Sequence, residues 1–176
     1  VFNSKGELVA SLDLFREDLG VFDLDQLSNA DPIELPAMPR EEEKYQLILD
    51  ALEMGVRDYF EKNGLKKAIL GLSGGLDSAV CLVIATRALG SENISALLMP
   101  GPHSSDHSVS DALALANNLG VEHHTVPIKE IVSSFTLSLE SFFKGTNPGV
   151  AEENLQARAR AVLLMAVSNK QGHILL

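Results

Sequence analysis

The sequence predicts an α/β fold in which a parallel sheet carries helices on both faces. Two observations support this prediction. Short apolar runs alternate with longer helical patterns from residue 41 onward, and glycines end three of the helical patterns, as they commonly do in folded helices. Strands joined by helices of this length need right-handed crossovers, which place the strands parallel in one sheet. A short β appendage is expected ahead of this fold.

The first part of the chain is predicted to form that appendage and a linker. Residues 1–25 carry the apolar runs "VFNSKGELVASL" and "LGVFDLD", which favour two or three short strands with a turn at 3–6. Residues 26–40 contain three prolines without sustained periodicity, which is typical of a linker. Short strands in this number cannot bury a core by themselves. The appendage is therefore expected to be an edge element or the tail of a domain that lies upstream.

Helices and strands then alternate along the chain, with two helices in succession before the last strand. Apolar residues recur at helical spacing over 41–63, acidic residues lead the first turn, and Gly64 ends the pattern. The run "KKAILGL" is then predicted to be a buried strand. The later helices are predicted at 78–89, 108–119, 128–144 and 152–170, and the strands at 66–72, 94–100, 121–128 and from 173 onward.

Composition and charge exclude some classes of function. Most of the formal net charge of −10 lies ahead of residue 66, and no basic stripe indicates nucleic-acid binding. No apolar run is long enough to span a membrane. The single cysteine, Cys81, excludes an internal disulfide, so a cytoplasmic setting is expected. Cys81 itself is expected to be a small core residue of its helix.

The candidate binding residues lie between the first strand and the next helix, in the stretch "GLSGGLDS". Glycines leave backbone N–H groups unshielded, the helix that follows adds its partial positive end, and Ser73 and Ser78 supply hydroxyl donors. Together these groups predict a phosphate cradle. Asp77 would repel phosphate unless a hard cation such as Mg2+ joins the two. The alternative is that Asp77 or Ser78 only caps the helix and the glycines only make the turn.

Further polar residues are candidates for the same site. The loop "MPGPHSSD" follows the second strand, so it should share one crevice with the glycine loop. His103, Asp106 and His107 could share a metal ion, but the loop context and the lack of a third committed ligand favour their interpretation as solvated loop side chains. Arg158 and Arg160 lie two apart on one helix and so face different ways, which allows only one of them to enter a site.

At this point the sequence resembles a known family. "SGGLDS" resembles the pyrophosphate loop of the N-type ATP pyrophosphatases, which adenylate a substrate. Two further stretches, "LLMPGPHSSDHSVSDALALANNLG" and "AEENLQARARAVLLMAVSNKQG", resemble NAD synthetases. "FREDLGVFDLD" is similar to the end of the nitrilase-like glutaminase domain of glutamine-dependent members. The implied fold is the Rossmann-like fold of adenine nucleotide alpha hydrolases.

The resemblance implies an enzyme that amidates deamido-NAD to NAD through an adenylate, releasing AMP and pyrophosphate. ATP and Mg2+ would be the cofactors, and ammonia would come from glutamine. Met99 would lie at the adenine pocket, Arg158 would contact deamido-NAD, Asp77 would hold Mg2+, and Arg160 is a second candidate. The residues expected to bind ATP in the loop are Gly71, Leu72, Ser73, Gly74, Gly75, Leu76, Asp77 and Ser78.

The resemblance also implies a division of the chain. Residues 1–25 would be the tail of the glutaminase domain, 26–40 the linker and 41–176 the N-terminal part of the synthetase domain. A homo-oligomer is expected, and the fragment alone is expected to be inactive because the family's later ATP and Mg2+ contacts lie beyond Leu176. Two alternatives stay open: another adenylating ATP pyrophosphatase, similar to GMP synthetase or to a tRNA-modifying enzyme, and a non-catalytic ATP-binding module.

Overall fold

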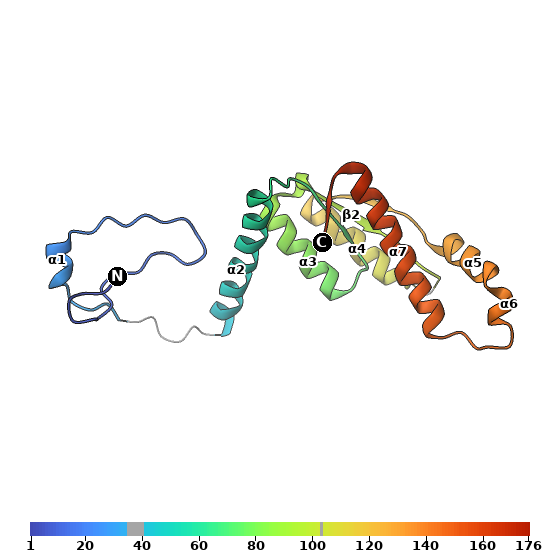
Figure 1. The fold of residues 1–176 in the computed structure, drawn as a ribbon, viewed down its shortest axis with the longest axis horizontal. Helices are drawn as coiled ribbons and strands as arrows, with labels where there is room; N and C mark the ends of the chain where they lie inside the picture. The colour runs from blue at the N-terminus through green and yellow to red at the C-terminus, as the bar shows by residue number, and fades with distance from the viewer. Residues whose placement is uncertain (35–40, 103) are drawn as a thin grey trace. The chain divides into compact units, whose positions relative to one another are not determined.

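The computed structural model describes residues 1–34, 41–102 and 104–176, and the chain divides into two compact units, Val1–Gly55 and Val56–Leu176 (Figure 1). The end of the predicted linker, residues 35–40, and His103 of the hypothetical metal group lie outside the described residues. Within the described residues, no helix has the length and apolar character needed to cross a membrane.

In the first unit, the prediction of two or three strands is wrong. Among residues 1–34, the strand pairing is limited to one isolated antiparallel bridge between Phe2 and Leu8. The predicted turn at 3–6 is confirmed, because Gly6 N donates to Asn3 O over 3.0 Å. The Asn3 side-chain oxygen also accepts bonds from the backbone N–H groups of Lys5 and Glu7. These local bonds compete with a strand ladder for the same backbone groups.

A short helix, α1 (Leu24–Ser28), begins inside the segment predicted as strand and ends in the predicted linker. Asp23 caps it by accepting a bond from Asp25 N over 2.9 Å. An aspartate at this position satisfies the free N–H groups of a first turn. Helix α2 (Glu41–Lys62) follows, as the apolar spacing predicted.

The predicted parallel sheet is confirmed. Four strands lie in the order β3-β2-β1-β4, and every pairing is parallel. Ala68 in β1 pairs with Ile94 on one side and with Ile174 on the other, so β1 is an internal strand. The strands are β1 (Ala68–Gly71), β2 (Ile94–Leu98), β3 (Glu122–Thr125) and β4 (Ile174–Leu175).

The helices between the strands agree with the prediction except at their ends. Helix α3 starts two residues earlier than predicted, so Leu76 and Asp77 belong to its first turn. The helix predicted at 128–144 divides into two at Leu139. After α3 (Leu76–Leu89) come a 3-10 turn η1 (Ser91–Asn93), α4 (Asp106–Leu119), α5 (Lys129–Ser138), α6 (Glu140–Phe143) and α7 (Val150–Gln171).

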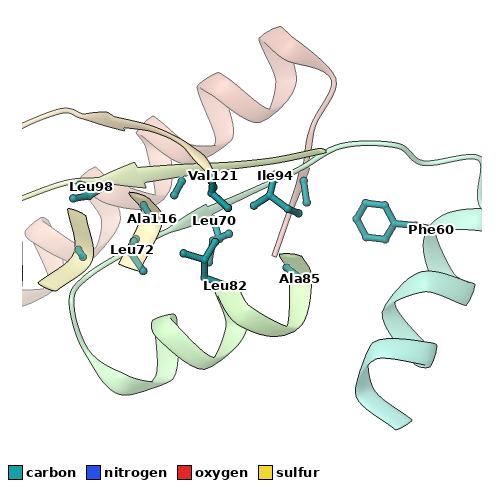
Figure 2. Close-up of a cluster of buried hydrophobic side chains, with 12 residues drawn as sticks. Phe60, Leu70, Leu72, Leu82, Ala85, Ile94, Leu98, Ala116 and Val121 are labelled. Atoms are coloured by element: carbon teal, nitrogen blue, oxygen red, sulfur yellow. The ribbon is translucent and has the colours of Figure 1, made fainter. Parts of the chain in front are cut away.

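Helices cover both faces of the sheet, as predicted. On one face, alternate residues of β1 and β2 pack with α3, α4 and the end of α2, and Figure 2 shows Phe60 and Leu82 pointing toward the strands. On the other face, Leu97 and Met99 pack with residues of α5 and α7. The central strands β1 and β2 thus bury both of their sides, as strands inside a parallel sheet do, whereas most residues of the edge strand β3 are exposed.

The prediction for Cys81 is wrong. It was expected in the core, but its side chain is exposed. The buried residues of α3 are Leu82, Ala85 and Ala88, and Cys81 lies one turn before Ala85, near the start of the helix. Helical spacing identified the correct face, but that face is buried only from Leu82 onward.

Candidate functional site

The predicted crevice lies where β1 and β2 end. The chain leaves β1 for β2 and β3 on one side and returns to pair β4 on the other side of β1, so β1 is the point at which the strand order reverses. Ligands of open α/β sheets bind beyond the carboxyl ends of the strands at such a point. A cavity of about 530 Å³ opens there, and its walls include Gly71 at the end of β1, Ser73 after it, Met99 after β2, Ser108 of α4 and Arg160 of α7.

The loop between β1 and α3 is closed by its own serines. Ser73 N and Ser73 Oγ lie 3.2 and 3.0 Å from Ser78 Oγ, which donates to Gly75 O over 2.9 Å. Gly75 N in turn donates to Ser73 Oγ over 3.1 Å. The two hydroxyls therefore shape the loop. A bound anion would exchange some of these internal bonds for its own.

Helix α3 begins without a side-chain cap. Its N-cap residue is Gly75, which has no side chain to accept the N–H groups of the first turn. By contrast, Ser105 caps α4 by accepting a bond from Ser108 N over 3.1 Å. The free N–H groups of a helix start carry partial positive charge and suit an anion. The interpretation of Asp77 or Ser78 as a helix cap is therefore wrong, because both lie inside the helix.

Gly74 lies against the first turn of α4. Its φ is +82°, and a β-carbon built on it would lie 2.0 Å from the carbonyl oxygen of Ser108. The glycine loop therefore packs directly against the start of α4. The prediction that the two strand-end loops share one crevice is confirmed, since Ser73 of the first loop and Ser104 of the second line the same cavity.

Asp77 is the candidate ligand of a divalent cation. It is exposed in the first turn of α3, next to the uncapped N–H groups. Among the described residues, no three His, Cys, Asp or Glu side chains are grouped to hold a metal ion. One carboxylate beside an anion site suits Mg2+, which commonly takes one or two carboxylates and completes its shell with phosphate oxygens and water. The residues present therefore fit that ion, and phosphate would be needed with it.

Met99 and the two arginines have distinct places. Met99 is 7% exposed, and its carbonyl oxygen accepts a bond from Arg160 Nε over 3.1 Å. Arg160 lines the cavity, whereas Arg158 is exposed on α7 and is not among the lining residues. The expectation that only one of the two arginines enters a site holds for this cavity. The resemblance had favoured Arg158, and the structure brings Arg160 to the cavity.

A second hollow of about 980 Å³ lies between α5, α6 and the start of α7. Gln156 lines it, and Gln156 Oε1 also lies beside Gly101, whose neighbour Pro100 lines the first cavity. The two hollows are therefore separated by the chain around Gly101. The walls of the second hollow are mostly apolar or uncharged, and its charged lining residues are Glu140, Lys144 and Glu152.

Some lining residues escaped the sequence analysis. Ser104 and Ser108 lie in or next to the loop that was predicted to share the crevice, so that loop was the available signal. Leu164 on α7 and Leu176 after β4 also line the cavity. Neither carries a polar group, and only the return of α7 and β4 to the side of β1 brings them there.

The comparisons with known proteins agree with this geometry. The sequence profile of the family described as NAD synthase matches residues 48–176. A glutamine-dependent NAD(+) synthetase of Synechocystis is 47% identical over 178 residues, which cover 99% of this chain and 31% of that protein. The chain thus spans about a third of the length of this curated relative.

Two solved structures are also similar. The glutamine-dependent NAD+ synthetase of Acinetobacter baumannii in complex with ADP aligns with a TM-score of 0.73 at 44% identity, over 80% of this chain and 26% of that one. The NMN synthetase of Francisella tularensis aligns with a TM-score of 0.66 at 27% identity, over 74% of this chain and 52% of that one. The implied adenine nucleotide alpha hydrolase-like fold is confirmed. The family profile matches most of this chain, and 99% of the chain aligns with a relative that is 47% identical. The chain therefore belongs to the NAD synthase family.

Proposed function

We propose that this chain carries the ATP-binding part of a glutamine-dependent NAD synthetase, which amidates deamido-NAD through an adenylate and releases AMP and pyrophosphate. The observation that supports this most is the uncapped, glycine-lined start of α3 beside a cavity of about 530 Å³ in a chain of this family. The site is suited to holding a nucleotide with its phosphates toward the helix.

The chemistry asks the chain to bind and orient anions. In the proposed reaction, negative charge builds up on the departing pyrophosphate, and fixed donors aimed at that charge lower the barrier. The backbone N–H groups of the loop and of the first turn of α3 would supply these donors. Ser73 and Ser78 would hold the loop in shape through their mutual bonds. Met99 would form part of the adenine wall.

Asp77 would hold Mg2+ against the phosphates. When bound, the ion neutralises charge on the phosphate oxygens. Asp77 would keep it beside the helix start, so that the carboxylate and the phosphate no longer repel each other. The other members of the loop, Gly71 through Leu76, would bind ATP through their backbone.

The partners of the proposal lie largely outside this chain. Residues 1–25 would be the end of a glutaminase domain, 26–40 a linker and 41–176 the start of the synthetase domain, within a cytoplasmic homo-oligomer. Ammonia would arrive from glutamine hydrolysed upstream. Deamido-NAD would meet Arg158, whose side chain is exposed on α7.

A nucleotide acceptor with one phosphate is the second candidate, because the Francisella neighbour is named an NMN synthetase. A GMP synthetase-like enzyme, a tRNA-modifying enzyme and a non-catalytic ATP-binding module remain as alternatives of other kinds. Each differs from the main proposal in what accepts the adenylyl group, so the acceptor is the variable to test.

The test uses the full-length protein that contains this chain. It is incubated with ATP, Mg2+ and ammonia together with deamido-NAD or nicotinate mononucleotide, and NAD or NMN, AMP and pyrophosphate are quantified. Equal amounts of NAD, AMP and pyrophosphate support the proposal. NMN formation in place of NAD moves the acceptor to the mononucleotide. Release of AMP and pyrophosphate only when some other acceptor is supplied points to a sister enzyme. The absence of ATP cleavage with any acceptor contradicts an enzymatic role.

A further inference from the structure

Arg160 holds the end of β2 in place. Its Nε donates to the carbonyl oxygen of Met99 over 3.1 Å, across 61 positions of the chain. The bond ties the middle of α7 to the first residue after β2. Because the Met99 backbone was expected to form the adenine wall, this bond fixes a wall of the nucleotide cavity.

Gly101 makes room for the Arg160 side chain. A β-carbon at Gly101 would lie 2.9 Å from Arg160 Nη2 and 2.8 Å from Gln156 Oε1. The guanidinium therefore lies directly over the Gly101 backbone. Gly101 N also donates to Ser104 Oγ over 2.8 Å, and Ser104 lines the cavity. The guanidinium thus supports the turn that carries a second part of the cavity wall.

Arg160 also supplies charge. Among the described residues that line the cavity, it is the one with a charged side chain. A guanidinium has five donors and a fixed planar shape, so one N–H can bond a carbonyl while others face an anion. Arg158, two residues earlier on α7, is exposed and cannot do the same from its position.

From these contacts we infer that Arg160 is a positioning residue of the nucleotide half of the site. Its Nε fixes the end of β2, and its charge favours the anionic nucleotide in the cavity. The inference deepens the proposed function and rests on it for the identity of the nucleotide. Arg158 remains the residue proposed for deamido-NAD, so the two arginines act on different substrates.

The test measures ADP binding by calorimetry, and then the KM of ATP and of deamido-NAD, in the full-length protein. Arg160→Lys keeps the charge and loses the forked geometry, and Gly101→Ala pushes the guanidinium away without changing it. Both should weaken ADP binding and raise the KM of ATP about tenfold or more, the loss expected for one charged hydrogen bond. The KM of deamido-NAD should stay within about twofold.

Two controls match these variants. Lys170→Ala removes a positive charge from the last turn of α7, and Gly55→Ala adds a methyl group where nothing lies within 4 Å. Both should bind ADP as the wild type does. Arg158→Lys should show the opposite pattern, with the KM of deamido-NAD raised and ADP binding retained.

Each outcome decides between the two claims. If Arg160→Lys and Gly101→Ala, shown by thermal melting to be folded, bind ADP as the wild type does, the inference is overturned. An increase confined to the KM of deamido-NAD also overturns it. A wild type that binds ADP but forms no NAD contradicts the proposed function and leaves the ADP titrations as the test of Arg160. A wild type that does not bind ADP contradicts both.

Discussion

Replacement of Gly74 by alanine should disconnect the glycine loop from α4. Two effects act at this position. The φ of +82° is strained for any residue with a β-carbon, at a cost of about 1–2 kcal/mol. In addition, the new β-carbon would lie 2.0 Å from Ser108 O, 2.6 Å from Ser108 C and 2.7 Å from Ser108 Cα. These are backbone atoms, which cannot rotate away as the end of a side chain can.

The size of the functional loss follows from that overlap. A β-carbon is essentially never found closer than 3.0 Å to another heavy atom, so the loop and the start of α4 must separate by about 1 Å. A misplacement of this size in a positioned site costs about 100-fold in activity. ADP affinity and the NAD-forming kcat/KM should therefore both fall by about two orders of magnitude in Gly74→Ala.

Gly145 provides the matched control. Its φ is +83°, almost the same as that of Gly74, but nothing lies within 4 Å of a β-carbon built there. Gly145→Ala should show the backbone strain in its melting temperature and keep ADP binding. Calorimetric titration of both variants with ADP separates strain from overlap. If Gly74→Ala binds ADP as Gly145→Ala does, the packing of the loop on α4 is not what organises the site.

Three further predictions concern the metal, the core and one surface pair. Asp77→Asn should abolish Mg2+-dependent turnover while ADP measured without Mg2+ still binds; turnover within about tenfold of wild type would remove Asp77 as the metal ligand. Phe60 is 2% exposed, so Phe60→Ala should lower the free energy of unfolding by about 3–5 kcal/mol in chemical denaturation. Tyr59 is 59% exposed, so Tyr59→Ala should lower it little. Equal losses would contradict the packing of the end of α2 on the sheet. The hydrogen bond from Lys62 to Asp58, and then the charge of Asp58, raise the pKa of Lys62 above its usual 10.5. Because the pKa of Lys62 is higher in the folded state, the pair stabilises the fold at neutral pH and loses that contribution as the pH rises through the raised pKa. The melting temperatures of Lys62→Met and the wild type should therefore converge at that high pH. A difference in melting temperature that persists there would refute the linkage.

The sheet and its order of helices could be predicted from the sequence because their signals are local. The apolar runs that became β1 and β2 are buried on both sides, so they are continuous and easy to recognise. The glycines that end the helices mark boundaries in the same way. The starts of α3 and α4 were both placed two residues late, whereas the last residues of both helices were predicted correctly.

The errors occurred where distant segments decide the outcome. The runs in residues 1–25 have strand-like composition but form one bridge, because a strand needs a partner that the composition does not reveal. The loop residues at the cavity were identified by their chemistry. The choice between Arg158 and Arg160 depended on how α7 is rotated against β2, and spacing alone allowed either arginine to point inward.

The position of β4 has a consequence for how this unit folds. Ile94 and Ala68 are 26 residues apart along the chain, whereas Ile174 and Ala68, which also pair, are 106 apart. Closing a loop four times longer costs about 1.2 kcal/mol more in chain entropy. Contacts of such long range form late and slow folding. The three strands β1, β2 and β3 can therefore assemble during synthesis before α7 and β4 arrive. Arg160 and Leu176 belong to α7 and to the residue after β4, so the cavity at the strand ends acquires these two walls only after that later segment has docked.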